Sequence, residues 1–162
     1  MSRPFVLVLG ALLSGVAHGA HAQHAIWATQ HRGVDSVLLE RTRCFGRCPA
    51  YSVLLTTRGI VRFWAEGKTG PPTASDSVGA PAFMIVWDDA WIGKIMTLPN
   101  DIEQSPLCTN PRTDAPYAIL TLFTTQGSKR VVDYLGCDGV PSELRDVEVA
   151  IDARTRVNRW IH

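Results

Sequence analysis

The sequence has little histidine where a catalytic protein would need it. Its five histidines stand at positions 18, 21, 24, 31 and 162, so none lies between His31 and His162. Histidine is the usual general base of hydrolases and a frequent metal ligand. The central region has none, and we expect no metal site and no cofactor. A non-catalytic protein is therefore the favoured interpretation, and a hydrolase that uses acidic residues is an alternative.

The sequence also lacks an excess of charge of either sign. Its 16 basic residues stand against 15 acidic ones, and the basic count falls to 15 without residues 1–22, which contain Arg3 and no acid. A balanced chain has no electrostatic basis for binding nucleic acid or an anionic membrane. We therefore expect neither of these partners, and a protein or cell-envelope component instead.

Long apolar runs are absent apart from one at the start, from Phe5 to Ala17. That run follows one positive charge and precedes the small-x-small sequence Ala20-His21-Ala22, which is the order found in a secretory signal peptide. It is too short to cross a hydrocarbon core of ~30 Å comfortably as a helix. An N-terminal helix packed into the core is the alternative.

The signal-peptide interpretation defines the expected organisation of the chain. We predict a signal peptide over residues 1–22, cleavage after Ala22, a flexible leader over 23–34 and a single domain over 35–162. The protein would be periplasmic or secreted, with no membrane span after cleavage.

Short apolar segments separated by turn residues predict the fold. Alternating or β-branched segments predict strands over 35–43, 51–56, 60–64, 117–124 and 129–135. Helical spacing predicts helices over 87–96 and 142–152, the second with Ser142 as its N-cap. Residues 83–86 fit either a strand or a helix start, and 67–81 predict a loop. The order β-β-β-α-β-β-α predicts an α+β domain, with an antiparallel sheet of about five strands and two helices on one face.

Four cysteines are the main chemical feature: Cys44, Cys48, Cys108 and Cys137. An even number in a small exported domain favours disulfides, with three possible pairings. We favour Cys44–Cys48, which flanks a three-residue turn that allows the ~5.5 Å Cα separation of a disulfide. We pair Cys108 with Cys137 because the loop after Cys108 can fold back beside the end of a strand.

A thiol–disulfide redox site at Cys44 and Cys48 is the alternative function. Three arginines, at positions 41, 43 and 47, surround this pair, and positive charge lowers a thiol pKa. However, three residues separate the cysteines where a thioredoxin-like site has two, and no βαβ unit accompanies them. A structural role is therefore the favoured interpretation.

A second candidate site is an interaction patch. Its members are Arg41, Arg43, Arg62, Trp64 and Asp114. Asp114 precedes a strand and could pair with Arg41 or Arg43, although an Asx-turn is the simpler role for it. Arg62 and Trp64 would form a patch if they lay on an exposed face of the sheet.

The stretch from Cys44 to Tyr51 reads Cys-Phe-Gly-Arg-Cys-Pro-Ala-Tyr. It resembles a family of exported bacterial domains of unknown function whose opening hairpin carries Cys-Phe/Tyr-Gly-x-Cys-Pro-x-Tyr. Looser similarity covers most of the chain after residue 22, and the 67–81 loop and the pair Cys108 and Cys137 depart from the usual pattern. The resemblance implies the fold and export but no activity. We interpret the chain as an exported binding or structural module of the cell envelope, braced by disulfides.

Overall fold

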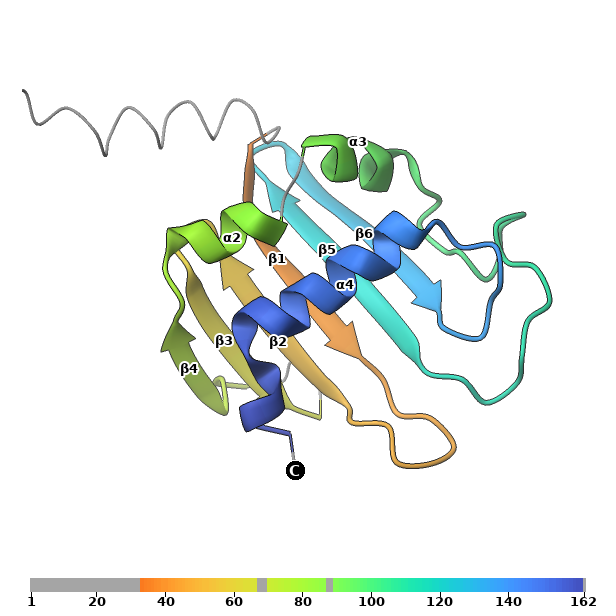
Figure 1. Cartoon of the computed structure of the whole chain (residues 1–162), viewed down its shortest axis with the longest axis horizontal. Coiled ribbons are helices and arrows are strands. Elements are labelled where there is room, and N and C mark those ends of the chain that lie inside the picture. The colour runs from red at the N-terminus through yellow and green to blue at the C-terminus, as the bar shows by residue number, and fades with distance from the viewer. Residues whose placement is uncertain (1–32, 67–69, 87–88, 162) are drawn as a thin grey trace, which may run out of the picture.

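The computed structural model of the chain describes residues 33–66, 70–86 and 89–161. Within them, six strands form one antiparallel sheet in the order β4-β3-β2-β1-β5-β6 (Figure 1). The strands are β1 (Val34–Arg41), β2 (Tyr51–Thr56), β3 (Ile60–Ala65), β4 (Ala74–Ser77), β5 (Tyr117–Thr124) and β6 (Gly127–Tyr134). The helices are α2 (Ala80–Val86), α3 (Asp89–Thr97) and α4 (Ser142–Thr155), followed by the 3-10 turn η1 (Val157–Arg159). The predicted signal peptide and residues 23–32 of the leader lie outside the described residues.

β1 is the central strand and defines the two faces of the sheet. Leu39 pairs with Val53 of β2 on one side and with Leu120 of β5 on the other. Successive side chains of a strand point to opposite faces, so these three share one face, and all three are buried. The alternation in β1 therefore points Val37, Leu39 and Arg41 to one face, as the sequence predicted.

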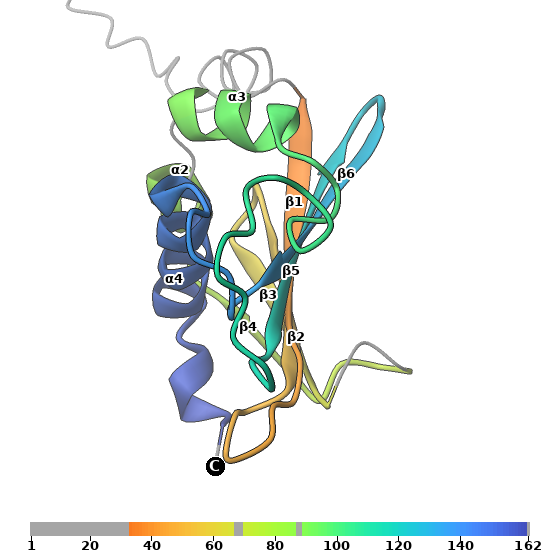
Figure 2. The same ribbon diagram turned by 90° about the vertical axis from the view of Figure 1, so that its right-hand side faces the viewer.

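The helices cover one face of the sheet, as predicted. Figure 2 shows α2 and α4 on the same side, and α2 and α3 both pack against α4. The buried face of α4 carries Leu144, Val147 and Ile151, which join the apolar side chains of the sheet in one core. In the described part of the chain, no helix has the length and hydropathy needed to cross a membrane.

Three details differ from the sequence-based prediction. The loop predicted over 67–81 contains strand β4, whose residues Ala-Ser-Asp-Ser show no apolar alternation and which forms by pairing with β3. Residues 80–86 form helix α2, so the described residues contain three α-helices instead of the two predicted. Ser142 is the first residue of α4 and Pro141 is its N-cap, with no side-chain cap hydrogen bond.

The turn between β2 and β3 is in close backbone contact with the segment that enters α2. Gly59 has a φ of 75°, and a Cβ there would lie 2.1 Å from the carbonyl carbon of Gly79. The amide of Val78 also donates to the Gly59 carbonyl at 2.8 Å. Only glycine combines this φ with such a close approach at low cost.

Candidate functional site

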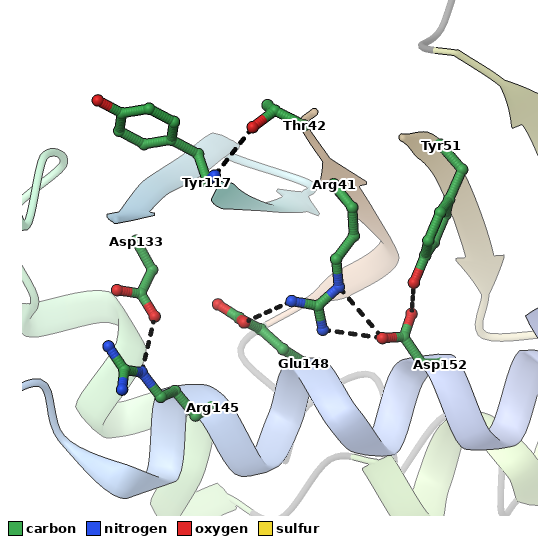
Figure 3. A network of polar contacts seen from close by, with 8 residues as sticks. All are labelled: Arg41, Thr42, Tyr51, Tyr117, Asp133, Arg145, Glu148 and Asp152. Atoms are coloured by element: carbon green, nitrogen blue, oxygen red, sulfur yellow. Dashed lines mark hydrogen bonds and ion pairs between the residues drawn. The ribbon is translucent and has the colours of Figure 1, made fainter. Parts of the chain in front are cut away.

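Charged and phenolic side chains meet between α4 and the sheet, as Figure 3 shows. They come from three strands and one helix, and we call them the α4 network. Its members are Arg41, Tyr51, Asp133, Arg145, Glu148 and Asp152.

Arg41 is the centre of the α4 network. Its Nε and Nη2 donate to Oδ2 of Asp152 at 3.2 and 2.8 Å, and its Nη1 donates to Oε2 of Glu148 at 3.3 Å. Tyr51 donates its hydroxyl to the other oxygen of Asp152 at 2.6 Å. Burial would lower the pKa of Arg41, but Asp152 and Glu148 outweigh it and raise this pKa. The guanidinium thus stays charged and ties β1 to α4 by charge-assisted hydrogen bonds.

Glu148 is a buried carboxyl group with incomplete hydrogen bonding. Its side chain is 1% exposed, and Oε1 has no hydrogen-bond partner in the described structure. Burial raises the pKa of Glu148 to about 8, Arg41 opposes this shift and Asp133 adds to it. Burial disfavours the charged form of a carboxyl group. Burial therefore favours the protonated form of Glu148, and the charge of Arg41 favours the ionised form.

Asp133 repeats this arrangement at the other end of the network. It is fully buried, its Oδ2 accepts from Nε of Arg145 at 3.2 Å, and its Oδ1 has no described partner. Burial raises the pKa of Asp133, and the hydrogen bond and charge of Arg145 oppose this shift. Arg145 also donates to the carbonyl of Cys137 at 2.8 Å, which links the network to a disulfide.

The α4 network has the features of a structural device. Its acids are engaged by arginines, and across the described residues no group of three or more His, Cys, Asp or Glu side chains could hold a metal ion. None of its members lines the cavity described next. The network fixes α4 on the sheet and presents no group to a ligand in that cavity.

A solvent-accessible cavity of about 440 Å³ lies beside the first disulfide. We call it the hairpin cavity. It is lined by Arg43, Cys44, Gly46, Cys48, Pro49, Ala50, Phe63, Ala65, Glu66, Trp160 and Ile161. The ring of Phe63 lies 5.1 Å from that of Trp160 and 5.8 Å from that of Tyr51, measured between centroids. The lining therefore combines aromatic and aliphatic side chains with an exposed ion pair between Arg43 and Glu66.

The segment between β1 and β2 forms one wall of this cavity. A disulfide joins Cys44 to Cys48 with a Cα separation of 5.5 Å, and the Gly46 amide donates to the Cys44 carbonyl at 2.9 Å. Phe45, inside this small ring, is 92% exposed. At the base of the segment, Thr42 exchanges two hydrogen bonds with Tyr117, at 3.0 and 2.8 Å. The hairpin thus holds an exposed aromatic side chain next to the cavity.

The predicted disulfides are both present. The second joins Cys108 to Cys137 across 29 residues, and the reciprocal backbone hydrogen bonds of Thr109 and Asp138 bring the two segments together. Cys137 is fully buried, and no described cysteine is free.

The redox alternative is not favoured, because Cys44 and Cys48 are joined in a disulfide and two of the three nearby arginines have acidic partners. Arg41 binds Glu148 and Asp152, and Arg43 pairs with Glu66. Neither arginine is therefore available to stabilise a thiolate at Cys44 or Cys48 in the way that a low thiol pKa requires.

The residues of the predicted interaction patch lie in different places. Arg41 faces α4, and Arg43 is on the hairpin with Glu66 as its partner. Arg62 and Trp64 alternate with the buried Phe63 and so face away from the helices, with Arg62 exposed and Trp64 only 5% exposed. Asp114 is exposed with a φ of 63°, and its described contacts include no ion pair to Arg41 or Arg43.

The sequence interpretation missed the acids of α4. Glu148 lies four residues after Leu144 and three before Ile151, inside the apolar stripe of the helix. An acid in such a stripe is a signal for a buried partner, and Arg41, on the inward face of β1, is that partner.

The comparisons with known proteins give one finding. Residues 35–155, more than half of the chain, match the family model described as "Domain of unknown function (DUF6438)". A search of curated proteins finds no match.

Proposed function

The chain belongs to the family described as "Domain of unknown function (DUF6438)", and on this premise we propose that it is an exported, non-catalytic binding module. Its binding surface is the disulfide hairpin together with the hairpin cavity, and its ligand is an apolar side chain of a polypeptide. The observation that carries the proposal is an aromatic-lined cavity next to an exposed, disulfide-held Phe45.

The lining of the cavity supports this ligand class. Trp160 and Ile161, both partly exposed, offer apolar surface in front of the buried Phe63, whereas the Arg43–Glu66 pair adds an exposed polar group. The cavity therefore offers both polar and apolar contacts, and protein-binding surfaces combine the two. The α4 network, in contrast, is enclosed between α4 and the sheet.

Export is supported by the start of the sequence and is compatible with the two disulfides. The order of one charge, an apolar run and Ala20-His21-Ala22 is that of a signal peptide, and disulfides persist in oxidising compartments. We expect protein recovered from an exported fraction to have an intact mass that begins at Gln23, with no thiol open to alkylation. A mature mass that retains residues 1–22 would contradict export with cleavage.

Blocking the cavity tests the binding role. We expect N-acetylphenylalaninamide to shift the NMR signals of the Trp160 indole and the Ala50 amide, and Ala65→Trp to abolish these shifts. Ala65 lines the cavity and is itself exposed, so a larger side chain there fills the cavity without entering the core.

Two controls accompany this test. Ala153→Trp places the same side chain on the exposed part of α4, away from the cavity, and should leave the shifts intact. The polar analogue N-acetylasparaginamide should give no shifts. If the phenylalanine analogue perturbs the Ala65→Trp variant as strongly as the wild type, the cavity is not the binding site.

A further inference from the structure

Phe45 is the most exposed of the large hydrophobic residues in the described chain. It is 92% exposed, compared with 63% for Val149 and 40% for Ile60. The Cys44–Cys48 disulfide closes the chain around it, so that Phe45 projects from a ring of five residues. Burial of this ring against a partner would be favourable, and the disulfide restricts the segment that carries it.

The same hairpin supplies both a projecting group and a concave one. Phe45 lies between Cys44 and Gly46, and these two neighbours, with Cys48, line the hairpin cavity. A surface that carries a projection beside a cavity can serve as both halves of a contact. When two copies are related by a two-fold axis, each projection can enter the cavity of the other copy.

Resting on the proposed function, we propose that the polypeptide bound at the hairpin cavity is a second copy of this chain. Phe45 of each copy enters the hairpin cavity of the other and packs on Trp160 and Ile161. The dimer has a two-fold axis between the two hairpins and two identical contacts.

The charges of the hairpin favour this occupant. Arg47, two residues after Phe45, is exposed, and the described ion pairs do not include it. The cavity rim carries the exposed carboxylate of Glu66, which has Arg43 as its present partner. Entry of Phe45 would bring Arg47 of one copy towards Glu66 of the other. Without residues 1–22 the chain has 15 basic and 15 acidic residues, so two copies do not repel each other strongly.

Complementary variants test the arrangement. Phe45→Ala removes the projection, and Ala65→Trp fills the cavity, so each variant alone has no intact contact with itself. In sedimentation equilibrium, we expect each variant to weaken self-association at least about tenfold relative to the wild type. An equimolar mixture restores one of the two contacts, because Phe45 of the filled variant can enter the open cavity of the other. We expect the mixture to associate more strongly than either variant alone.

Val149→Ala is the matched control, since Val149 is also exposed and apolar but lies on α4 outside the cavity lining. It should associate like the wild type. A wild type that stays monomeric at millimolar concentration overturns the proposal, as does a mixture no stronger than its parts.

The proposed binding function is judged separately, by the shifts that N-acetylphenylalaninamide causes. A monomer whose cavity still binds this compound contradicts only the identity of the partner. A monomer that does not bind it contradicts both proposals.

Discussion

At the scale of single residues, the α4 network shows how few charges can fix a helix on a sheet. Arg41 alone contacts two acids four positions apart on α4, so its guanidinium spans one helical turn. Tyr51, on the neighbouring strand β2, donates its hydroxyl to the second carboxylate oxygen of Asp152. Its ring also stacks on Phe63, which lines the hairpin cavity. The network and the cavity are thus joined through one aromatic side chain.

The buried carboxyl of Glu148 gives the protein a defined pH dependence. Its pKa is about 8 in the folded state against an ordinary value near 4.5, so the folded state holds the proton more tightly. Its contribution to stability is complete below pH 4.5 and is lost as the pH rises to about 8. Asp133, whose pKa is also raised, acts in the same direction. We expect the free energy of unfolding to fall between pH 5 and pH 9, by on the order of a few kcal/mol.

Glu148→Gln should make the free energy of unfolding less dependent on pH. The amide is neutral at every pH and keeps an oxygen that can accept from Arg41, so the variant should match the wild type near pH 5 and exceed it at pH 9. Urea unfolding at several pH values measures this. Glu143→Gln on the same helix is the control. Lys94 lowers the pKa of Glu143 from its ordinary value of 4.5, so Glu143 titrates below the pH range in which the stability is expected to fall. If the free energy of unfolding falls equally steeply with pH in the wild type and in Glu148→Gln, Glu148 is not the group responsible for the pH dependence.

At the scale of elements, periodicity predicted the strands and helices that bury an apolar face. The bounds of β2 and β5 agree with the prediction, and the other three predicted strands differ by one to two residues at their ends. The α4 prediction was correct in position because Leu144, Val147 and Ile151 repeat at helical spacing.

The elements that the sequence did not predict depend on their neighbours. β4 consists of Ala-Ser-Asp-Ser, and its four residues pair with Ile60 to Phe63 of β3. Its stability comes from this pairing and not from local propensity, so no pattern in residues 74–77 indicates a strand. Helix α2 is similar, since it packs against α4, which lies far from it in the sequence.

The candidate site was predictable only in part, for a related reason. The cysteine spacing indicated a tight turn between Cys44 and Cys48. The cavity, however, also needs Phe63 from β3 and Trp160 from the end of the chain, and only the packed fold brings these together. The partners of Arg41 are more than 100 positions away in sequence, and no local pattern connects them.

At the scale of the whole molecule, the two disulfides should have separate roles. Cys108–Cys137 joins residues that are 29 positions apart in the sequence. The carbonyl of the buried Cys137 also accepts a hydrogen bond from Arg145 of α4. Cys44–Cys48 closes a separation of only 4 residues at the tip of the fold, next to the hairpin cavity. In the chain-entropy model, the longer loop restricts the unfolded state more.

Replacing each disulfide pair by alanines should therefore show that one disulfide contributes more to stability and the other more to binding. We expect Cys108→Ala with Cys137→Ala to lower the free energy of unfolding by about 3 kcal/mol, and Cys44→Ala with Cys48→Ala to lower it by about 2 kcal/mol or less. The second pair should nevertheless show the greater loss of self-association and of N-acetylphenylalaninamide binding, because it holds Phe45 and lines the cavity. Urea unfolding and sedimentation equilibrium on the same samples measure both effects. Equal losses of binding in the two double variants would mean that the hairpin disulfide does not organise the surface, and that Phe45 is exposed for another reason.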